Sequence, residues 1–512
     1  MSAPETPAAS SVLADLLALG RPIGDLRPWQ AVEVGAAAWV AIAERLAAGE
    51  ADLLALWGEP GAVRLALFDA ATRRPALVRL SCPEGRYPSV GALHPPAIRP
   101  ERAIRELVGL EPIGLPDGRP WLDHGRWGVR TPLGTPQPSS DTGEPYAFLK
   151  AEGEGLHQIP VGPVHAGIIE PGHFRFTANG ETVVRLEERL GYVHRGLEGL
   201  MTGAPIAHAA MLAGRASGDS TVAYGIAFAR AVEAAAGAEP PPRAVWLRAL
   251  MAELERLANH LGDVGAICND AAFALMHAHT AALRERVLRA SAAAFGHRLM
   301  MDVIVPGGVV IDLRKDGSDA IRAVVGTVRT ALPALVRLYD GTPSLQDRTV
   351  GTGRATAALV ARFACGGPVG RGSGRDFDAR RDLAYPPYDR LAFSVPVLTA
   401  CDVDARVRVR LAEIEASLSM IDEILTGLPG GPVLAPVDIT VAGEGIAVAE
   451  AFRGDVLAWV RLAGDGTVAR CHLRDASWFQ WPVLEAAIEG NIVADFPLLN
   501  KSFNCSYAGH DL

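Results

Sequence analysis

The sequence predicts an α+β protein, with a small N-terminal α+β domain followed by a large domain built on a buried helical bundle with peripheral short β-strands. Three observations predict this class. Long segments carry apolar residues at helical spacing, shorter segments alternate apolar and polar residues, and a Pro/Gly/Ser-rich stretch at 131–145 divides the chain. We therefore expect a first domain over residues 1–130, a linker over 131–150 and a second domain over 151–512.

The order of the elements supports this division. In the first domain, residues 31–49 predict an amphipathic helix and residues 62–83 predict two short strands about a turn. The second domain begins with turns and short strands over 156–187. Its Ala-rich, continuously apolar segments then predict a tightly packed bundle. The bundle segments are 216–237, 242–270, 279–296, 317–338 and 405–428. From 445 onward, strands alternate around a Gly-Asp-Gly turn, and a short helix over 482–490 follows.

The composition excludes several classes of protein. Of 512 residues, 49% are hydrophobic and 21% are charged, which argues against disorder. A net charge of -9 without a sustained Lys/Arg run argues against a nucleic-acid partner. No apolar stretch is long enough to span a bilayer and no signal peptide is visible, so we expect a cytoplasmic protein. The glycine-rich segments 351–357 and 370–374 lack the strand–turn–helix context of an NAD-binding fingerprint.

The cysteines do not form a metal-binding motif. The chain has 6 of them, and they are scattered, without a Cys-x-x-Cys pair. In the segment GRASGDS (214–220), Ser217 and Ser220 instead stand at the head of the helical segment 216–237. This pair is either an ordinary helix N-cap or the polar lining of a pocket.

Five segments, in order along the chain, resemble one superfamily. They are GPVHAGIIEPGHFRF (162–176), LGYVHRGLEGL (190–200), AELERLANHLGDVGAICND (252–270), GPVGRGSGRDFDARRD (367–382) and WPVLEAAIEGNIVADFPLLNKSFNCSY (481–507). They resemble the large subunit of energy-converting nickel–iron hydrogenases and the related quinone-site large subunit of respiratory complex I. Residues 101–128 resemble the small complex I subunit that packs beside it. The whole chain is thus similar to the fused large subunits of the formate hydrogenlyase and hydrogenase-4 type.

The resemblance also locates the positions of the hydrogenase metal ligands, which are four cysteines. The first pair falls on Ser217 and Ser220, beside a retained Arg215. The second pair falls on Ser506 and Gly509. A thiol with a pKa of about 8.5 is readily deprotonated by nickel, whereas a serine hydroxyl is far less acidic and glycine offers no side chain. The resemblance therefore implies a large subunit that binds no metal.

The complex I relatives, which also lack nickel ligands, use the equivalent cavity for a quinone head group beside a partner's iron–sulfur cluster. They provide a histidine from the first loop motif, held by an aspartate on a bundle helix, and a tyrosine. The resemblance places the aspartate at Asp270 and the histidine at either His165 or His173. The tyrosine position falls on Gly218, so Tyr224 on the same helix either substitutes for it or packs in the core.

Further residues match positions that line or border this cavity. Glu198 matches a glutamate near the start of the hydrogenase proton path, or it forms a hydrogen-bonded pair at a helix terminus. Arg371 and Asp376 match the region of the diatomic-ligand pocket, where, without iron, we expect ion-pair partners. Glu450 and Arg453 match a strand and turn that line the same cavity.

The resemblance implies an electron-transfer large subunit of a membrane-associated, complex-I-like oxidoreductase. It would pass electrons from a 4Fe–4S cluster in a partner subunit to quinone or another small acceptor, and would bind no cofactor itself. The implied partners are a small iron–sulfur subunit and antiporter-like membrane subunits, which would hold the chain on the cytoplasmic face of the inner membrane. The alternatives are a non-catalytic assembly or coupling module and, as a minor alternative, a functional hydrogenase large subunit.

Overall fold

The computed structural model describes residues 12–140, 145–165 and 169–512, and it divides the chain into two compact units. The first unit ends at Gly118 and is completed by Gly128–Ser139. The second unit contains Arg119–Trp127 and the chain from Ser140 to Leu512. Residues 119–127 therefore cluster with the second unit, although the sequence pattern places them in the N-terminal domain.

The first unit is a mixed α/β unit around a five-stranded sheet. Its elements are α1 (Val12–Ala18), β1 (Arg21–Pro22), β2 (Leu26–Arg27), β3 (Gln30–Val34), α2 (Ala36–Ala47), β4 (Asp52–Glu59), β5 (Ala62–Asp69), β6 (Arg74–Ser81), β7 (Arg86–Pro88), η1 (Pro95–Ala97), α3 (Ile98–Val108), β8 (Glu111–Ile113), β9 (Val129–Arg130) and β10 (Gln137–Pro138). The sheet order is β1-β3-β6-β5-β4, with β3 and β6 parallel. The predicted strand pair at 62–83 is confirmed as β5 and β6. The segment predicted as one helix over 31–49 instead begins in β3, because Val32 and Val34 are buried in a strand that pairs with β6.

The second unit contains the helical bundle and three sheets. Its elements are β11 (Leu156–Val161), β12 (His173–Asn179), β13 (Thr182–Arg189), α4 (Leu197–Met201), α5 (Ile206–Ala213), η2 (Gly218–Ser220), α6 (Thr221–Ala236), α7 (Pro242–Asp270), α8 (Ala274–Phe295), β14 (Ile304–Val305), β15 (Gly308–Val309), α9 (Lys315–Asp340), α10 (Pro343–Thr349), α11 (Ala357–Arg362), α12 (Gly367–Arg371), α13 (Ala379–Asp382), α14 (Val403–Gly427), β16 (Ala442–Ala451), β17 (Gly454–Ala463), β18 (Val468–Arg474), α15 (Ser477–Ala487), η3 (Val493–Asp495), α16 (Phe496–Phe503) and α17 (Tyr507–Asp511). The predicted α+β class is confirmed. The helix predicted over 242–270 coincides with α7, and the other predicted bundle helices differ from α6, α8, α9 and α14 by a few residues at their ends.

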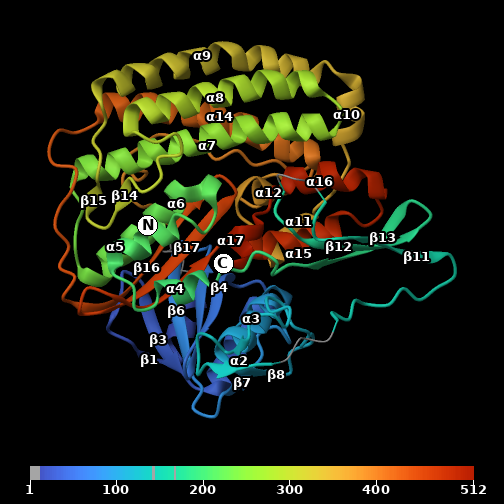
Figure 1. Ribbon diagram of the computed structural model, residues 1–512, viewed down its shortest axis with the longest axis vertical. Helices are drawn as coiled ribbons and strands as arrows, with labels where there is room; N and C mark the ends of the chain where they lie inside the picture. The colour runs from blue at the N-terminus through green and yellow to red at the C-terminus, as the bar shows by residue number, and fades with distance from the viewer. Residues whose placement is uncertain (1–11, 141–144, 166–168) are drawn as a thin grey trace, which may run out of the picture. The chain divides into compact units, whose positions relative to one another are not determined.

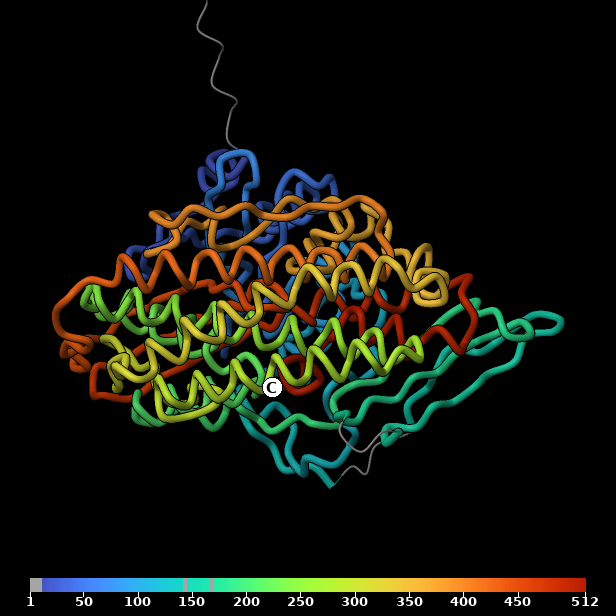
Figure 2. Tube along the Cα trace, turned by 90° about the horizontal axis from the view of Figure 1, so that it is seen from above, coloured from blue at the N-terminus to red at the C-terminus, as the bar shows by residue number. Residues whose placement is uncertain are grey.

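The long helices α7, α8, α9 and α14 lie side by side (Figures 1 and 2). Most residues of α7 are buried, including Arg256 and His260 in its interior. A helix that is buried on nearly every face packs against neighbours all round, which explains why apolar residues recur on all its sides and why its buried charged residues, such as Glu253 and Arg256, are paired. None of the helices in the described residues combines the length and the apolar character that a membrane crossing requires.

The strands β16, β17 and β18 form an antiparallel sheet against which α6 packs (Figure 1). The sequence predicts short peripheral strands, and this description fits the partly exposed β11–β13 sheet. In contrast, β16 and β17 are 10 residues long and almost entirely buried. The predicted Gly-Asp-Gly turn joins β17 to β18, with Gly464 and Gly466 at positive φ. The sheet therefore presents the β16–β17 turn, which carries Arg453, to the head of α6.

Candidate functional site

Two distant parts of the second unit meet at a pair of serines. Ser217 directly precedes η2, and Ser506 is the N-cap of α17. Their Oγ atoms lie 2.9 Å apart, and both residues are buried. Ser506 Oγ also accepts a hydrogen bond from the backbone N–H of Gly509 over 2.9 Å. Three of the four positions that the resemblance assigns to nickel ligands are thus joined by hydrogen bonds.

A bidentate ion pair lies beside the serines. The guanidinium of Arg453 donates to Oδ1 and Oδ2 of Asp219 over 2.7 and 2.5 Å. It also donates to Ser220 Oγ over 3.3 Å and to the backbone carbonyl of Asn504. Burial raises the pKa of Asp219, but Arg453 and the hydroxyl of Ser217 together hold it below its usual value. Arg453 therefore links the head of α6 to the C-terminal segment.

The two serines do not cap α6. Ser217 and Ser220 occupy N-cap positions, but neither side chain makes a cap hydrogen bond. Glu255 of α7 takes this role, since its carboxylate accepts the backbone N–H groups of Val222 and Ala223 over 2.8 and 3.2 Å. Burial raises the pKa of Glu255 to about 8. The N-cap interpretation is therefore wrong, because a carboxylate from the next helix satisfies the free N–H groups.

A cavity of about 360 Å³ lies at this cluster. It is lined by residues 169–170, 217–219, 500–501 and 504–508, together with Arg453. A Cβ built on Gly218 would meet no atom within 4 Å, so this position faces open space. The lining is rich in hydroxyl, amide and charged groups, and the polar-lining interpretation of Ser217 is therefore the one that the geometry supports.

The donor set does not fit a nickel–iron centre. In the described part of the chain, no group of three or more His, Cys, Asp or Glu side chains is placed to hold a metal ion. Cys505 lines the cavity, but its Sγ lies 3.8 Å from Gln480 Oε1, and burial raises its pKa well above the usual value. Neutral hydroxyls and a thiol that resists deprotonation are poor ligands for a soft metal.

Asp270 lies at the end of α7 and is half-buried. Burial raises its pKa, while the positive charge of Lys501, a cavity residue, acts in the opposite direction. The buried carboxylate of Asp263, two turns earlier, makes the contacts to other segments. It accepts hydrogen bonds from Arg410 over 3.0 Å and from Asn504 over 2.8 Å. Sequence reasoning did not assign Asp263, whose partners lie far away in the chain.

The two loop histidines lie against aromatic rings. The ring centroid of His165 is 5.6 Å from that of Phe174, and the His173 ring is 4.7 Å from that of Phe148. Burial lowers the pKa of His173. Within the described residues, neither histidine lines the cavity or forms a hydrogen bond with Asp270. The structure therefore does not bring together the expected Asp–His pair.

Tyr224 is fully buried and its hydroxyl is engaged. It donates a hydrogen bond to Asp475 Oδ2 over 2.7 Å, and burial raises its pKa well above the usual value. The same carboxylate accepts the backbone N–H of Ser477 over 2.8 Å. A Cβ on Gly509 would lie 2.6 Å from Asp475 Oδ2. Asp475 thus fills the space beside Gly509, and Tyr224 fixes that carboxylate in place.

Glu198 and Arg215 have partners away from the cavity. Glu198 is buried and accepts hydrogen bonds from His472 over 2.7 Å and from Arg470 over 3.4 Å. Burial raises the pKa of Glu198, but His472 and Arg470 bring it below the usual value. Arg215 forms a half-exposed bidentate pair with Asp302, at 2.8 and 2.7 Å. These contacts support a structural role for both residues.

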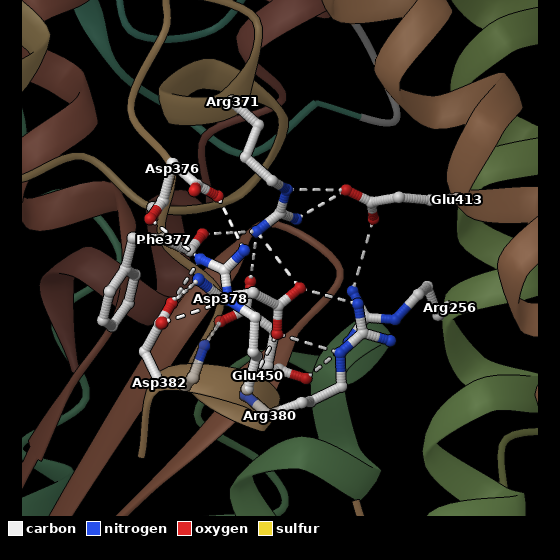
Figure 3. A network of polar contacts seen from close by, with 12 residues as sticks. Arg256, Arg371, Asp376, Phe377, Asp378, Arg380, Asp382, Glu413 and Glu450 are labelled. Atoms are coloured by element: carbon white, nitrogen blue, oxygen red, sulfur yellow. Dashed lines mark hydrogen bonds and ion pairs between the residues drawn. The ribbon is translucent and has the colours of Figure 1, made fainter. Parts of the chain in front are cut away.

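Arg371 and Glu450 belong to a buried ion network (Figure 3). Arg371 donates to Glu413 over 2.6 Å and to Glu450 over 3.0 Å. Arg380 donates to Asp378 over 2.7 Å. The network also includes the charged side chains of Glu253 and Arg256, and His260, whose pKa is lowered by burial, forms a hydrogen bond with Glu413 over 2.7 Å. This geometry supports the ion-pair interpretation of Arg371, because buried charges are retained when they are paired and hydrogen-bonded.

Glu450 and Asp376 differ in how tightly the network holds them. Burial, with the nearby charge of Asp378, raises the pKa of Glu450 to about 7. Its carboxylate also accepts the backbone N–H of Ala379 over 2.9 Å. Asp376 is exposed, and its ion pair with Arg381 at 2.8 Å lies at the edge of the network. Neither residue lines the cavity formed by the described residues.

Comparisons with known proteins agree with this architecture. Residues 270–442 match the family described as the respiratory-chain NADH dehydrogenase, 49 Kd subunit. Formate hydrogenlyase subunit 5 of Escherichia coli is 33% identical over 446 residues, which cover 85% of this chain and 78% of that protein. The carbon monoxide-induced hydrogenase of Rhodospirillum rubrum is 33% identical over 68% of this chain and 97% of its own length.

A solved structure shows the same fold. A chain of the membrane-bound sulfane sulfur reductase, described as an archaeal respiratory membrane complex, superimposes with a TM-score of 0.66 and 26% identity. The superposition covers 70% of the present chain and 99% of that chain. The chain therefore belongs to the family of large subunits that includes the 49 kDa subunit of respiratory-chain NADH dehydrogenase and formate hydrogenlyase subunit 5.

Proposed function

We propose that this chain is the electron-transfer large subunit of a membrane-associated, complex-I-like oxidoreductase. It passes electrons from a 4Fe–4S cluster in a partner subunit to a quinone or another small acceptor in the cavity beside Ser217. It does so without a nickel–iron centre. Support comes from its relatives, which include a formate hydrogenlyase subunit and, at 27% identity, an NADH-quinone oxidoreductase subunit of Koribacter versatilis.

The observation that carries the proposal is the polar cavity at the positions that the resemblance assigns to metal ligands. Reduction of a quinone takes two electrons and two protons, so the site needs hydrogen-bond donors and proton sources around the acceptor. Ser217, Asn500 and Lys501 are lining residues whose side chains carry donor groups. Arg453 neutralises the charge of Asp219, while Glu170, the other carboxylate of the lining, accepts the backbone N–H of Ala508.

The proposal includes partners and a location. Electrons enter from a small iron–sulfur subunit, and antiporter-like membrane subunits couple the reaction to ion translocation. These partners hold the chain on the cytoplasmic face of the inner membrane. The names of the relatives support this assembly, since they include a membrane-bound hydrogenase of Pyrococcus furiosus and a membrane-bound reductase.

Filling the cavity tests the proposal. Gly218 faces open space within the cavity, so Gly218→Leu places an isobutyl group where the acceptor binds. Gly326 on α9 also has no atom within 4 Å of a built Cβ and is exposed, so Gly326→Leu is the matched control. The purified complex is reduced with dithionite and its oxidation by a tail-free benzoquinone is followed. We expect a loss of at least about tenfold with Gly218→Leu only; equal rates would overturn the proposal.

One observation favours a second function, that of a non-catalytic assembly module. Arg453 and the Ser217–Ser506 hydrogen bond hold the C-terminal segment against the head of α6. A module of this kind needs these contacts between the C-terminal segment and α6, but it needs no electron acceptor in the cavity. It therefore predicts that Gly218→Leu has no effect on turnover, whereas removal of residues 504–512 dissociates the complex.

A further inference from the structure

The four charged side chains of the cavity lining differ in how the folded chain uses them. Arg453 and Asp219 form a bidentate pair, so their charges cancel. Glu170 accepts the backbone N–H of Ala508 over 2.8 Å. In contrast, the ammonium group of Lys501 makes no hydrogen bond and no ion pair with the described residues. Lys501 therefore brings to the cavity a positive charge that no ion pair within the described chain neutralises.

Lys501 is free to turn toward a ligand. It lies in the last turn of α16 and is partly exposed. It acts on Asp270 through its charge alone, which lowers the pKa of that carboxyl while burial raises it. A lysine side chain is a flexible four-carbon stem that ends in three rotatable N–H donors. The ammonium group can therefore meet a molecule in the cavity without giving up a hydrogen bond within the chain.

Other polar hydrogens of the lining are already used within the chain. The hydroxyl of Ser217 donates to Asp219 Oδ1 over 2.9 Å. The amide of Asn504 donates to Asp263 Oδ1 over 2.8 Å. A hydrogen bond from a charged donor to an anion is also stronger than one between neutral groups. Lys501 is therefore the strongest donor that the lining offers to a ligand.

The lining favours a small and hydrophilic ligand. Sites for lipophilic molecules are lined mainly by hydrophobic and aromatic side chains. Here Ile169 and Ala508 are the aliphatic members among the described lining residues, and most of the others carry hydroxyl, amide or charged groups. The volume of about 360 Å³ is near the lower end of the usual range for a ligand site. The described lining thus offers little apolar wall for the isoprenoid tail of a membrane quinone.

We propose that the acceptor of this cavity is a small hydrophilic anion and that Lys501 binds its negative charge. The inference rests on the proposed function and narrows the class of acceptor that the site takes. Glu170 carries the opposite charge and acts against an anion. The selectivity of the site for charge is therefore set by the balance between Lys501 and Glu170.

Two water-soluble quinones that differ in charge serve as probes. Benzoquinone sulfonate is an anion and methylbenzoquinone is neutral. Each takes two electrons from the reduced complex and two protons from water to form its hydroquinone, and the sulfonate group is unchanged. The purified complex is reduced with dithionite, freed of the excess, and oxidised by each quinone in turn. The ratio of the two second-order rate constants, sulfonate over methyl, cancels a general loss of electron transfer and reports selectivity alone.

Three variants of the lining test the inference. Lys501→Gln removes the positive charge, and we expect the ratio to fall about tenfold. Lys501→Arg keeps the charge and should keep most of the ratio, which separates charge from shape. Glu170→Gln removes the opposing charge and should raise the ratio. An unchanged ratio in Lys501→Gln would overturn the inference, and so would an equal fall in Lys501→Arg.

Lys315→Gln is the matched control. Lys315 is exposed at the start of α9 and does not line the cavity formed by the described residues. The same charge is removed from the chain, so a general effect of net charge would appear in this variant as well. We expect the ratio to stay unchanged, and a fall equal to that of Lys501→Gln would overturn the inference.

Salt provides a second measurement. Dissolved ions screen the attraction between an exposed ammonium group and an anion. The ratio should therefore fall more steeply with added KCl in the unmodified complex than in Lys501→Gln. Parallel salt curves for the two proteins would overturn the inference.

The outcomes separate the two proposals. If Gly218→Leu slows oxidation by both quinones while Lys501→Gln leaves the ratio unchanged, the class of acceptor is overturned and the acceptor cavity stands. If Gly218→Leu leaves both rates unchanged, the proposed function itself is overturned.

Discussion

The Oγ atoms of Ser217 and Ser506 lie 2.9 Å apart, although the two residues are 289 positions apart in the chain. The hydrogen bond joins two of the positions where relatives of the hydrogenase type are expected to carry thiolates. Beside it, Arg453 contacts both Asp219 and Asn504. A metal held at these positions would connect the head of α6 to the C-terminal segment. Here the Ser217–Ser506 hydrogen bond and the contacts of Arg453 connect them instead.

We expect the purified complex to contain no stoichiometric nickel. The four ligand positions are Ser217, Ser220, Ser506 and Gly509, and hydroxyls do not become ligands for nickel at neutral pH as thiolates do. Metal analysis of the purified complex measures this, with the iron of the partner's cluster as an internal reference. One nickel per chain would contradict both the prediction and the proposed function.

The Arg453–Asp219 ion pair is expected to contribute to stability. In Asp219→Asn the guanidinium of Arg453, which is 7% exposed, loses its charged partner. We expect the free energy of unfolding to fall by about 1–3 kcal/mol, because water in the cavity replaces only part of the contact. Thermal or denaturant unfolding of the isolated complex measures the change.

A matched control exists in the same unit. Asp302 forms the same bidentate contact with Arg215 and is 37% exposed, close to the 38% of Asp219, but Arg215 is 34% exposed whereas Arg453 is 7% exposed. Asp302→Asn should cost only about 0–1 kcal/mol, as is usual for exposed pairs. Equal losses in the two variants would show that burial of Arg453 does not set the strength of its contact with Asp219.

Glu255 predicts a specific pH dependence of stability. Burial raises its pKa to about 8 in the folded chain, from the usual value of 4.5. A raised pKa means that the folded chain binds this proton more tightly than the unfolded chain, so its contribution to stability is fully present below 4.5. The contribution is lost as the pH rises from there to about 8. Glu255→Gln should remove up to about 1.4 kcal/mol per pH unit of slope in this window. Unfolding midpoints at pH 5, 6, 7 and 8 measure it, and an unchanged slope would refute the prediction.

The sequence predicts the large features of this fold because they depend on local periodicity. The helix over 242–270 is an example, since its Pro start and continuous apolar pattern define α7. In contrast, residues 30–34 form β3 because they pair with β6. The local pattern of residues 30–34 carries no information about this pairing. Periodicity within one segment cannot report a partner strand that lies elsewhere in the chain.

The candidate site also depends on long-range contacts that local sequence patterns do not predict. Ser217 and Ser506 could be aligned from motifs, but the role of Asp219 depends on Arg453, 234 residues away. Asp219 lies inside the quoted segment GRASGDS, and a charged residue between two ligand positions was a signal that could have been followed. Nothing in the sequence indicates that Asp475 occupies the space at Gly509, because that contact depends on how β18 meets α17. Long-range contacts of this kind are set by packing.

Gly509 should not tolerate a side chain. A Cβ would lie 2.6 Å from Asp475 Oδ2, and Tyr224 and the N–H of Ser477 hold that carboxylate in place. We expect Gly509→Ala to reduce the free energy of unfolding by about 1–3 kcal/mol. Gly326→Ala, on an exposed face of α9 with open space around the Cβ, should be neutral or stabilising by up to about 1 kcal/mol.

A double-mutant cycle tests the cause of the Gly509 effect. Asp475→Ala leaves the Tyr224 hydroxyl without its acceptor and should be destabilising by itself. In the Gly509→Ala/Asp475→Ala double variant the new methyl group has room, so the two losses should not add. Additive losses would show that the carboxylate is not what excludes a side chain at position 509. The same contact predicts that replacing the four ligand positions with cysteine does not restore nickel binding, because Asp475 occupies the place of the fourth thiolate.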